Sequence, residues 1–393
     1  MTTWPSVAVI GGSIGGLTAA LLLRDLGCDV QIFERSSEEL ESRGAGIVVL
    51  PMTERYLVER GGEAARVSLT LTDWTYVDAT GEVLASDPDS FRFGSWMALY
   101  RALAAAFGND RYYLEHEMVA LDRGEESVTV GFSNGVEVEA DVAVCADGLA
   151  STARRLLLPE VAPEYAGYVA WRGTVPDEEL SAATRAVLDD AMLYQILPPG
   201  HVLVYAIPGS EGERDPGRRL INFVWYRNYP TGGPFEDLMT DVEGGSRSAT
   251  LPPGMVRAEH LEELHEAAGQ LAPAIREVVD KSASPFVQAI FDLESPQIAF
   301  GRVVLIGDAA FSARPHVAAG SAKAAADGWA LRDALRDAGG RVDAALAAWE
   351  PRQLELGRSV VDKSRRMGQR SQFEQTMAAG DPTWKFGLFE PGN

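Results

Sequence analysis

The residues best suited to chemistry begin with Asp308, near the C-terminal end of the chain. Val303 to Ile306 is a short apolar run typical of a strand buried on both faces, and Asp308 follows it closely. A turn containing proline then leads through Gly320 to an alanine-rich helix expected over 321–338. A strand, a carboxylate, a tight loop and a helix N-terminus can together hold the polar or anionic edge of a cofactor.

A glycine-rich turn near the start of the chain provides a second element of such a site. Residues 7–10 have the pattern of a buried strand, residues 11–16 form a tight turn, and the helix that follows is expected to end at Gly27. The next strand is expected over 29–33, and Glu34 stands at its end. This βαβ unit, with an acid about 20 residues after the turn, is the arrangement that binds a dinucleotide.

The expected cofactor contacts in this unit come from the turn and from the end of the second strand: Gly11, Ser13, Ile14, Gly16, Glu34 and Arg35. The glutamate has the spacing that hydrogen-bonds a ribose hydroxyl. Ser13 occupies the position of the middle glycine, but serine is small and can donate a hydrogen bond, so the assignment is kept. The alternative is a glycine-rich connection that binds no ligand.

The composition narrows the classes of function. The chain carries 35 basic and 57 acidic residues, a net charge of −22, which argues against nucleic acid and anionic membrane surfaces as partners. Cys28 and Cys145 lie in or beside apolar runs, so we expect buried thiols in a reducing compartment. The five histidines lack metal-binding spacing, and no run approaches the roughly 20 apolar residues of a membrane span. Because no signal peptide is recognisable, we expect a cytoplasmic protein without a metal site.

The order of the elements predicts an α/β protein with a discontinuous Rossmann-like domain and an inserted, mainly antiparallel β-sheet domain. The first domain is expected over 1–70, 96–162 and 294–340, the inserted substrate domain over 71–95 and 163–293, and a C-terminal helical segment over 341–393. Strands of the inserted domain are expected at 71–79, 165–175, 192–197, 201–207 and 220–226. The C-terminal helices, at 342–349 and 353–367, are expected to be kinked or broken at Pro351.

Three landmarks in a fixed order carry a resemblance to a known family. They are the glycine turn with Glu34, then Asp147-Gly148 with Ser151 and Arg154, then Gly307-Asp308 with Pro315. Over nearly the whole chain they resemble the class A flavin-dependent aromatic monooxygenases of the para-hydroxybenzoate hydroxylase type. Three further segments, 165–173, 201–209 and 314–316, are similar to the dihydroxypyridine hydroxylases within that family.

The resemblance implies FAD as the cofactor and NADH or NADPH as the co-substrate. It implies that Glu34 binds the adenosine ribose and that Asp308 holds the ribityl or pyrophosphate part of FAD. It also implies that Asp147 lies in the region that handles both FAD and the nicotinamide donor. Gly46, in the glycine-rich loop 43–47, could approach the flat flavin ring, with a plain turn as the alternative.

The chain also departs from the family pattern. The segment after Pro315 lacks the usual Gly-Gln-Gly-x-Asn run, and Trp96 stands where the family has an arginine. These departures leave the contact with NAD(P)H and the mobility of the flavin open.

The reaction that the resemblance implies needs an activated ring. NAD(P)H reduces FAD, O2 adds at carbon 4a of the flavin, and the distal oxygen of the hydroperoxide passes to an electron-rich ring. The ring must lose a proton fully or in part, so a base near neutral pKa or a hydrogen-bond relay is required. His316, next to Pro315 on the loop expected under the flavin, is the leading candidate for the base, with a structural histidine as the alternative and His201 as a weaker candidate. Arg314 could orient an anionic substrate or balance the charge of the reduced flavin, or be a solvated loop residue.

Aromatic residues of the inserted sheet are expected to wall the substrate pocket: Tyr168, Trp171, Tyr194, Tyr205 and Trp225. Each of them could instead be ordinary core. The expected reaction is hydroxylation of a hydroxylated aromatic or N-heteroaromatic ring, with 3-hydroxylation of 2,6-dihydroxypyridine as the best single choice. The alternative is another phenolic or heteroaromatic compound of secondary metabolism.

Two other classes of protein share this fold. A flavin-dependent halogenase should contain a Trp-x-Trp-x-Ile-Pro segment, which the sequence lacks. A binding protein of the GDP-dissociation-inhibitor type would have no flavin chemistry, and a colourless protein that FAD cannot reconstitute would favour it. The expected partners are the small ring substrate and O2, and a homodimer is kept as an option.

Overall fold

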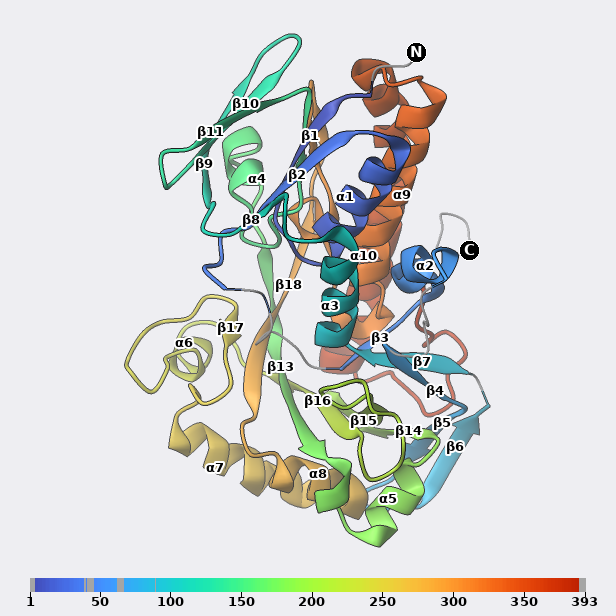
Figure 1. The fold of residues 1–393 in the computed structure, drawn as a ribbon. Helices are drawn as coiled ribbons and strands as arrows, with labels where there is room; N and C mark the ends of the chain where they lie inside the picture. Colours follow the sequence, from blue (N-terminus) through green and yellow to red (C-terminus); the bar gives the residue numbers. More distant parts are fainter. Residues whose placement is uncertain (1–3, 39, 41–45, 62–66, 89, 389–393) are drawn as a thin grey trace.

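A largely parallel sheet forms the upper half of the molecule, as the buried apolar runs predict. The computed structural model describes residues 4–38, 40, 46–61, 67–88 and 90–388 (Figure 1). The sheet has the strand order β19-β20-β12-β1-β2-β8. Its strands are β1 (Ser6–Ile10), β2 (Asp29–Phe33), β8 (Tyr112–Tyr113), β12 (Val142–Cys145), β19 (Ala299–Phe300) and β20 (Val303–Leu305). All neighbours pair in parallel except β19 and β20, so the carboxyl ends of β2, β12 and β20 meet at one edge.

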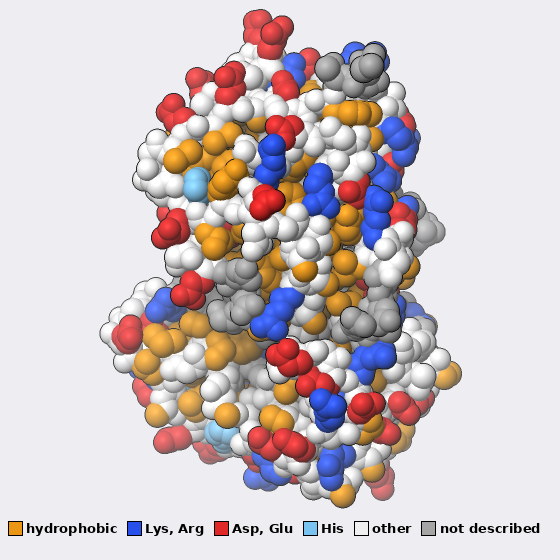
Figure 2. Space-filling model, in the orientation of Figure 1, with side chains coloured by type: hydrophobic (Ala, Val, Ile, Leu, Met, Phe, Trp, Pro, Cys, Tyr) orange, Lys and Arg blue, Asp and Glu red, His pale blue; other side chains and the backbone are white. Residues whose placement is uncertain are grey.

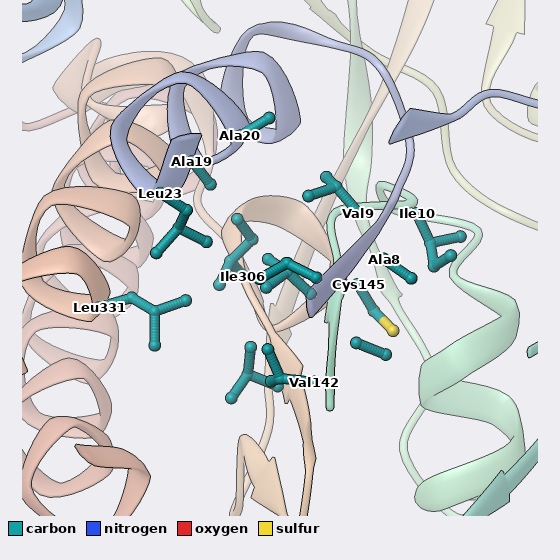
Figure 3. Close-up of a cluster of buried hydrophobic side chains, with 14 of the residues drawn as sticks. Ala8, Val9, Ile10, Ala19, Ala20, Leu23, Val142, Cys145, Ile306 and Leu331 are labelled. Carbon is teal, nitrogen blue, oxygen red and sulfur yellow. The ribbon is translucent and has the colours of Figure 1, made fainter. Parts of the chain in front are cut away.

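Helices bury one face of this sheet. Helix α1 (Ile14–Leu26) packs against α3 (Trp96–Phe107) and α9 (Gly320–Asp337), and α9 packs against α2 (Pro51–Glu59) and α10 (Val342–Gln369). Figure 3 shows Val9 of β1, Leu23 of α1, Cys145 of β12 and Leu331 of α9 in one buried cluster. Because α1 is enclosed by the sheet and by other helices, its sequence is apolar on nearly all sides.

The opposite face of the parallel sheet is covered by a small antiparallel sheet with the order β11-β10-β9. Its strands are β9 (Met118–Arg123), β10 (Val128–Phe132) and β11 (Glu137–Ala140). Val128, Val130 and Phe132 of β10 belong to the same buried core as β1 and β12. The helix α4 (Thr152–Leu157) contacts β9.

The lower half is built on a nine-stranded sheet with the order β17-β18-β13-β16-β15-β14-β5-β6, and β21 pairs with β18. Its strands are β5 (Asp73–Val77), β6 (Val83–Asp87), β13 (Glu164–Pro176), β14 (Ala191–Ile196), β15 (His201–Ile207), β16 (Leu220–Asn228), β17 (Thr250–Leu251), β18 (Phe286–Glu294) and β21 (Phe311–Ser312). The pairings are antiparallel apart from β14 with β5. The long strands β13 and β18 extend towards the upper half (Figure 1). This is the inserted, mainly antiparallel sheet that the sequence predicts.

Side chains alternate strictly between the two faces of the nine-stranded sheet. One face packs on α8 (Pro273–Lys281), with α5 (Ala182–Leu188) and α7 (Ala258–Ala267) beside it. The other face turns towards the upper half and carries tyrosines such as Tyr168, Tyr194 and Tyr205. Figure 2 shows hydrophobic side chains gathered at the waist of the molecule between the two halves.

A third antiparallel sheet has the order β3-β7-β4, with β3 (Gly46–Val48), β4 (Ser68–Leu71) and β7 (Phe91–Ser95). The strand expected over 71–79 is present as β5 at 73–77, but its expected first residue, Leu71, ends β4, which joins a different sheet. The short helix α6 (Pro234–Leu238) completes the lower half. The expected division of the chain into domains stays a prediction.

The C-terminal segment also differs from the sequence prediction. Helix α10 runs through Pro351 without a break, and Trp349, Gln353 and Leu356 are buried on both sides of the proline. This packing outweighs the lost backbone hydrogen bond of the proline. After a π-helical turn at Arg370–Glu374, the described residues 375–388 form no helix and run back over the lower sheet. No helix in the described part of the chain is both long and apolar enough to cross a membrane.

Candidate active site

The glycine turn and Glu34 form the first part of the site, at the carboxyl edge of the parallel sheet. Gly11 has a φ of 100°, and a Cβ there would lie 2.4 Å from the carbonyl oxygen of Ala146. The Glu34 carboxylate accepts hydrogen bonds from the Gly12 amide at 2.9 Å and from the amide and hydroxyl of Ser36. The two turns are thus fixed to each other before any ligand binds. They line a cavity of about 270 Å³ together with Ser13 and Arg35.

Asp147, at the end of β12, lines the same cavity. Its carboxylate accepts from the Ser151 hydroxyl at 2.6 Å and from the amides of Thr152 and Ala153 at 2.7 and 3.1 Å, so it caps α4. Arg154 is buried and donates to the carbonyl oxygens of Leu149 and Ala309. This arginine therefore ties the loop after β12 to the loop that carries Asp308.

Asp308 lies at the end of β20 and lines a larger cavity of about 400 Å³ with Gly320, the first residue of α9. Its side chain is open to the cavity, but protein atoms surround the cavity closely. This desolvation raises the pKa of the Asp308 carboxyl, against the opposing charges of Lys323 and Arg154. Lys323 itself forms a buried ion pair with Asp327 at 2.8 Å, which also accepts from the Gly307 amide.

The two cavities fit the two ends of an extended dinucleotide. They share the lining residues Leu149 and Ala249, so they lie next to each other. One end offers a glycine cradle that a Cβ would fill and an acid at the ribose position, while the other offers Asp308 and the N-terminus of an 18-residue helix. These features fit FAD, and the larger cavity is also lined by Gly46 and Pro315.

The upward face of the nine-stranded sheet forms the far wall of the larger cavity. Tyr194, His201, Tyr205 and Tyr226 line it, and their pattern follows the alternation of β14, β15 and β16. Tyr168 is fully buried directly behind His316. The expectation that all five aromatic residues of the sheet face the pocket is wrong for Trp171 and Trp225.

The two tryptophans lie on the opposite face of the sheet. Both are at most 1% exposed and belong to the core that includes Ile275 and Val278 of α8. Trp171 is three residues from Tyr168 on one continuous strand, and residues an odd number apart point to opposite faces. They therefore support the sheet from behind.

His316 lines the larger cavity and is 3% exposed. Its Nε2 atom lies 2.7 Å from the hydroxyl of Tyr168, and its Nδ1 atom has no partner in the described part of the chain. Burial, assisted by the charge of Arg314, lowers the pKa of His316 to about 3. The imidazole is therefore neutral at physiological pH, which does not suit the expected base of near-neutral pKa.

His201 is a second buried histidine in the same wall. Its Nδ1 lies 2.5 Å from the Ser371 hydroxyl, and its ring stacks on Tyr194 at 4.9 Å. Burial, and then the neighbouring His316, hold its pKa well below the ordinary value. Sequence reasoning ranked this residue low because a strand residue alone does not reveal which face it takes.

Arg314 does not reach the cavity that the sequence assigned to it. Its Nε donates to Asp292 at 2.7 Å, and its guanidinium carbon lies 5.8 Å from the centre of the Tyr168 ring. Arg365 donates to the same aspartate at 2.8 Å. Arg314 thus supports Tyr168 from behind, and the expected direct contact with the substrate is corrected.

Sequence reasoning missed several residues that line or close the cavity. Arg172 donates from Nη2 to the Gly46 carbonyl at 2.5 Å and from Nη1 to Gln288 at 3.1 Å. Arg172 is an even number of positions from Tyr168 along β13, so the alternation of side chains predicts that both residues lie on the same face of the sheet. Trp384 and Phe386 reach the cavity from the C-terminal segment, and no local signal predicts that contact. The expected flavin-loop residues Arg43 to Ala45 lie outside the described residues.

Residues 165–292 match a family described as FAD binding domain-like, and residues 5–183 match the pyridine nucleotide-disulphide oxidoreductases. A 2,6-dihydroxypyridine 3-monooxygenase of Paenarthrobacter nicotinovorans is 38% identical over 98% of this chain and 96% of its own. A 6-hydroxynicotinate 3-monooxygenase of Pseudomonas fluorescens is 28% identical over 98% and 96%. The chain belongs to the class A FAD-dependent aromatic monooxygenases.

Within this family, one solved structure is particularly similar. The 2,6-dihydroxypyridine-3-hydroxylase from Arthrobacter nicotinovorans matches with a TM-score of 0.94 and 37% identity, covering 100% of both chains. The protein is thus an FAD-dependent monooxygenase with FAD as cofactor and NAD(P)H as co-substrate. The described residues contain no group of three or more histidine, cysteine or acidic side chains that could hold a metal ion.

Proposed function

We propose that the enzyme hydroxylates a hydroxylated N-heteroaromatic ring, with 3-hydroxylation of 2,6-dihydroxypyridine as the best single reaction. The observation that carries this proposal is the cavity where the FAD crevice meets a wall of tyrosines and two neutral histidines. The similarity to a 2,6-dihydroxypyridine 3-monooxygenase over nearly the whole chain supports the substrate. When bound, FAD supplies the reduction of O2 and the transfer of one oxygen atom.

The protein residues would bind and orient the ring. Tyr194, Tyr205 and Tyr226 offer aromatic surface to a flat ring, and His316 offers a polar atom beside it. Pro315 holds His316 at the start of a short 3₁₀ turn under the proposed flavin position. Arg172 and Asn222 hold the peptide of Gly46, the Asn222 amide oxygen accepting from the Gly46 amide at 2.8 Å.

Cofactor contacts would come from both ends of the parallel sheet. We assign the adenosine end to Gly11, Ser13, Ile14, Gly16, Glu34 and Arg35, and the ring end to Gly46, Asp147, Asp308 and Gly320. Buried, unpaired Cys28 and Cys145 support a cytoplasmic location. A homodimer stays a proposal that the mass in solution would test.

The test is a screen of hydroxypyridines and phenols for stimulated oxidation of NADH or NADPH, coupled to analysis of the ring product. A hydroxylated pyridine in proportion to the NAD(P)H consumed supports the proposal. Peroxide without ring product for every compound contradicts it, because the ring would then be an effector only. The screen includes 6-hydroxynicotinate, since the relative that acts on it spans the whole chain.

A further inference from the structure

A buried hydrogen bond behind the cavity fixes the proton positions of His316. Arg314 donates to Asp292, and its guanidinium lies beside the ring of Tyr168. In the described part of the chain, the Tyr168 hydroxyl has one hydrogen-bond partner, the Nε2 atom of His316 at 2.7 Å. The phenolic proton is therefore donated to this nitrogen. The reverse arrangement would leave the buried phenolic proton without an acceptor.

The tautomer of His316 follows from the hydrogen bond with Tyr168. A neutral imidazole carries one N–H, and Nε2 accepts from Tyr168, so the proton is on Nδ1. This Nδ1 atom is buried and has no partner in the described part of the protein. A buried N–H without an acceptor is unfavourable, and the imidazole is part of the cavity wall. The Nδ1–H group of His316 is therefore a donor at the cavity wall that has no acceptor in the described part of the protein.

The groups that face His316 keep it neutral. They are Tyr168 from β13, His201 from β15, Tyr226 from β16, Trp384 from the C-terminal segment and Arg314 from its own loop. None of these carries a negative charge, and Asp292 behind them is paired with two arginines. Protonation of His316 would thus place a second positive charge beside Arg314 in a buried site.

The described residues of this wall include no other group able to take a proton near pH 7. His201 is held neutral in the same way, and burial raises the pKa of Tyr194, Tyr205 and Tyr226. Asp308 stands at the edge of the parallel sheet, where the cofactor is assigned. Arg172 adds a positive charge to the cavity.

We propose that the site binds its ring as an anion already ionised in water, and that His316 donates a hydrogen bond to the ring oxygen from Nδ1 instead of removing its proton. The inference rests on the proposed function and narrows its substrate class. The proton is released to solvent water before binding, so the ring hydroxyl must ionise at or below the working pH. 2,6-Dihydroxypyridine satisfies this condition because its anion shares the negative charge between two ring oxygens and the ring nitrogen. Simple phenols, with a pKa of about 10, do not.

The binding test uses the FAD-loaded, oxidised enzyme without NAD(P)H. Its two probes are 2,6-dihydroxypyridine and resorcinol, which have the same hydroxyl spacing with and without a ring nitrogen. We expect bound 2,6-dihydroxypyridine to have the absorption spectrum of its anion, with a Kd that is constant above its own pKa and rises about tenfold per pH unit below it. Resorcinol should bind more tightly by about tenfold per pH unit as the pH rises towards its pKa. Tight, pH-independent binding of neutral resorcinol would overturn the proposal.

The role of His316 is tested by His316→Gln and His316→Leu. The glutamine amide can donate a hydrogen bond but cannot act as a base, whereas leucine can do neither. We expect kcat/KM of His316→Gln to stay within about tenfold of the parent and that of His316→Leu to fall about 100-fold or more. Equal losses in the two variants would overturn the donor role. His265→Gln, on the surface in α7, is the matched control.

The positioning role of Tyr168 has a separate readout. In ¹⁵N-histidine-labelled enzyme, which has only five histidines, His316 should show the Nδ1–H tautomer. Tyr168→Phe removes the donor to Nε2 and should shift His316 towards the other tautomer. An Nε2–H tautomer in the parent enzyme would contradict the inference. The binding and NMR measurements need no turnover, so they decide the inference even if the proposed hydroxylation is not found.

Discussion

The hydroxyl of Tyr168 lies 2.7 Å from Nε2 of His316, although 148 positions of the sequence separate the two residues. This bond joins β13 of the nine-stranded sheet to the loop that follows β21, at the boundary between the proposed flavin site and the proposed ring site. Because both partners are buried, the bond fixes the orientation of the imidazole.

Glu34→Gln should weaken FAD binding. The carboxylate accepts three hydrogen bonds from two turns, and the amide can accept at only one of its two terminal atoms. Loss of a charge-assisted bond of about 1.5–3 kcal/mol corresponds to a Kd roughly 10 to 100 times higher. Fluorescence titration of the apoprotein with FAD measures this change. Glu160→Gln, an exposed acid, is the control, and an unchanged Kd for Glu34→Gln would remove Glu34 from the cofactor site.

Gly46→Ala should lower both FAD affinity and activity. A Cβ at Gly46 would lie 2.7 Å from Tyr205 and 2.9 Å from Asn222, so the strand β3 would have to move away from the cavity. The matched control is Gly269→Ala, where a Cβ meets nothing within 4 Å. Activity assays and FAD titrations of both variants check this prediction. Parental behaviour of Gly46→Ala would show that the close approach is not required.

Lys323→Met should destabilise the protein strongly. It leaves Asp327 buried without its ion-pair partner, which typically costs about 3–5 kcal/mol. The control Asp362→Asn breaks an exposed pair with Arg366 and should cost less than about 1 kcal/mol. Urea unfolding of the two variants makes the comparison. Similar small losses would mean that Asp327 is protonated or rearranged when Lys323 is removed.

Stability should fall as the pH drops from 7 to 5, in part because of His316. Its pKa is about 3 in the folded protein and about 6.5 in the unfolded chain, so the unfolded state binds more protons in this range. The stabilising contribution is complete above about pH 6.5 and declines towards pH 3, by up to about 1.4 kcal/mol per pH unit. His316→Gln should flatten this dependence in urea unfolding experiments. A slope equal to that of the parent would place the His316 pKa near its ordinary value.

Local patterns in the sequence predicted much of the scaffold. The first βαβ unit and the strand 201–207 agree with the structure, because buried apolar runs and glycine turns are local signals. The alternation of side chains along β13 could also have placed Tyr168 and Trp171 on opposite faces of the sheet. The two residues are three positions apart, and residues an odd number apart on a strand point to opposite faces.

Other parts of the site depend on distant packing that no local pattern records. Ser371, Trp384 and Phe386 meet His201 and the cavity only because the chain after α10 folds back over the lower sheet. The unbroken helix at Pro351 has the same origin, since burial on both sides outweighs the local preference. Arg314 was assigned to the substrate because its partner Asp292, on β18, is distant in sequence.

The central claim is that one oxygen atom from O2 enters a hydroxypyridine ring in the cavity between the two sheets. The most direct measurement is mass spectrometry of the product formed from 2,6-dihydroxypyridine by the FAD-loaded enzyme with NAD(P)H under ¹⁸O2. We predict a trihydroxypyridine that contains one ¹⁸O atom in the new hydroxyl group. Unchanged substrate with peroxide as the only oxygen product, or a new hydroxyl derived from water, would contradict the claim.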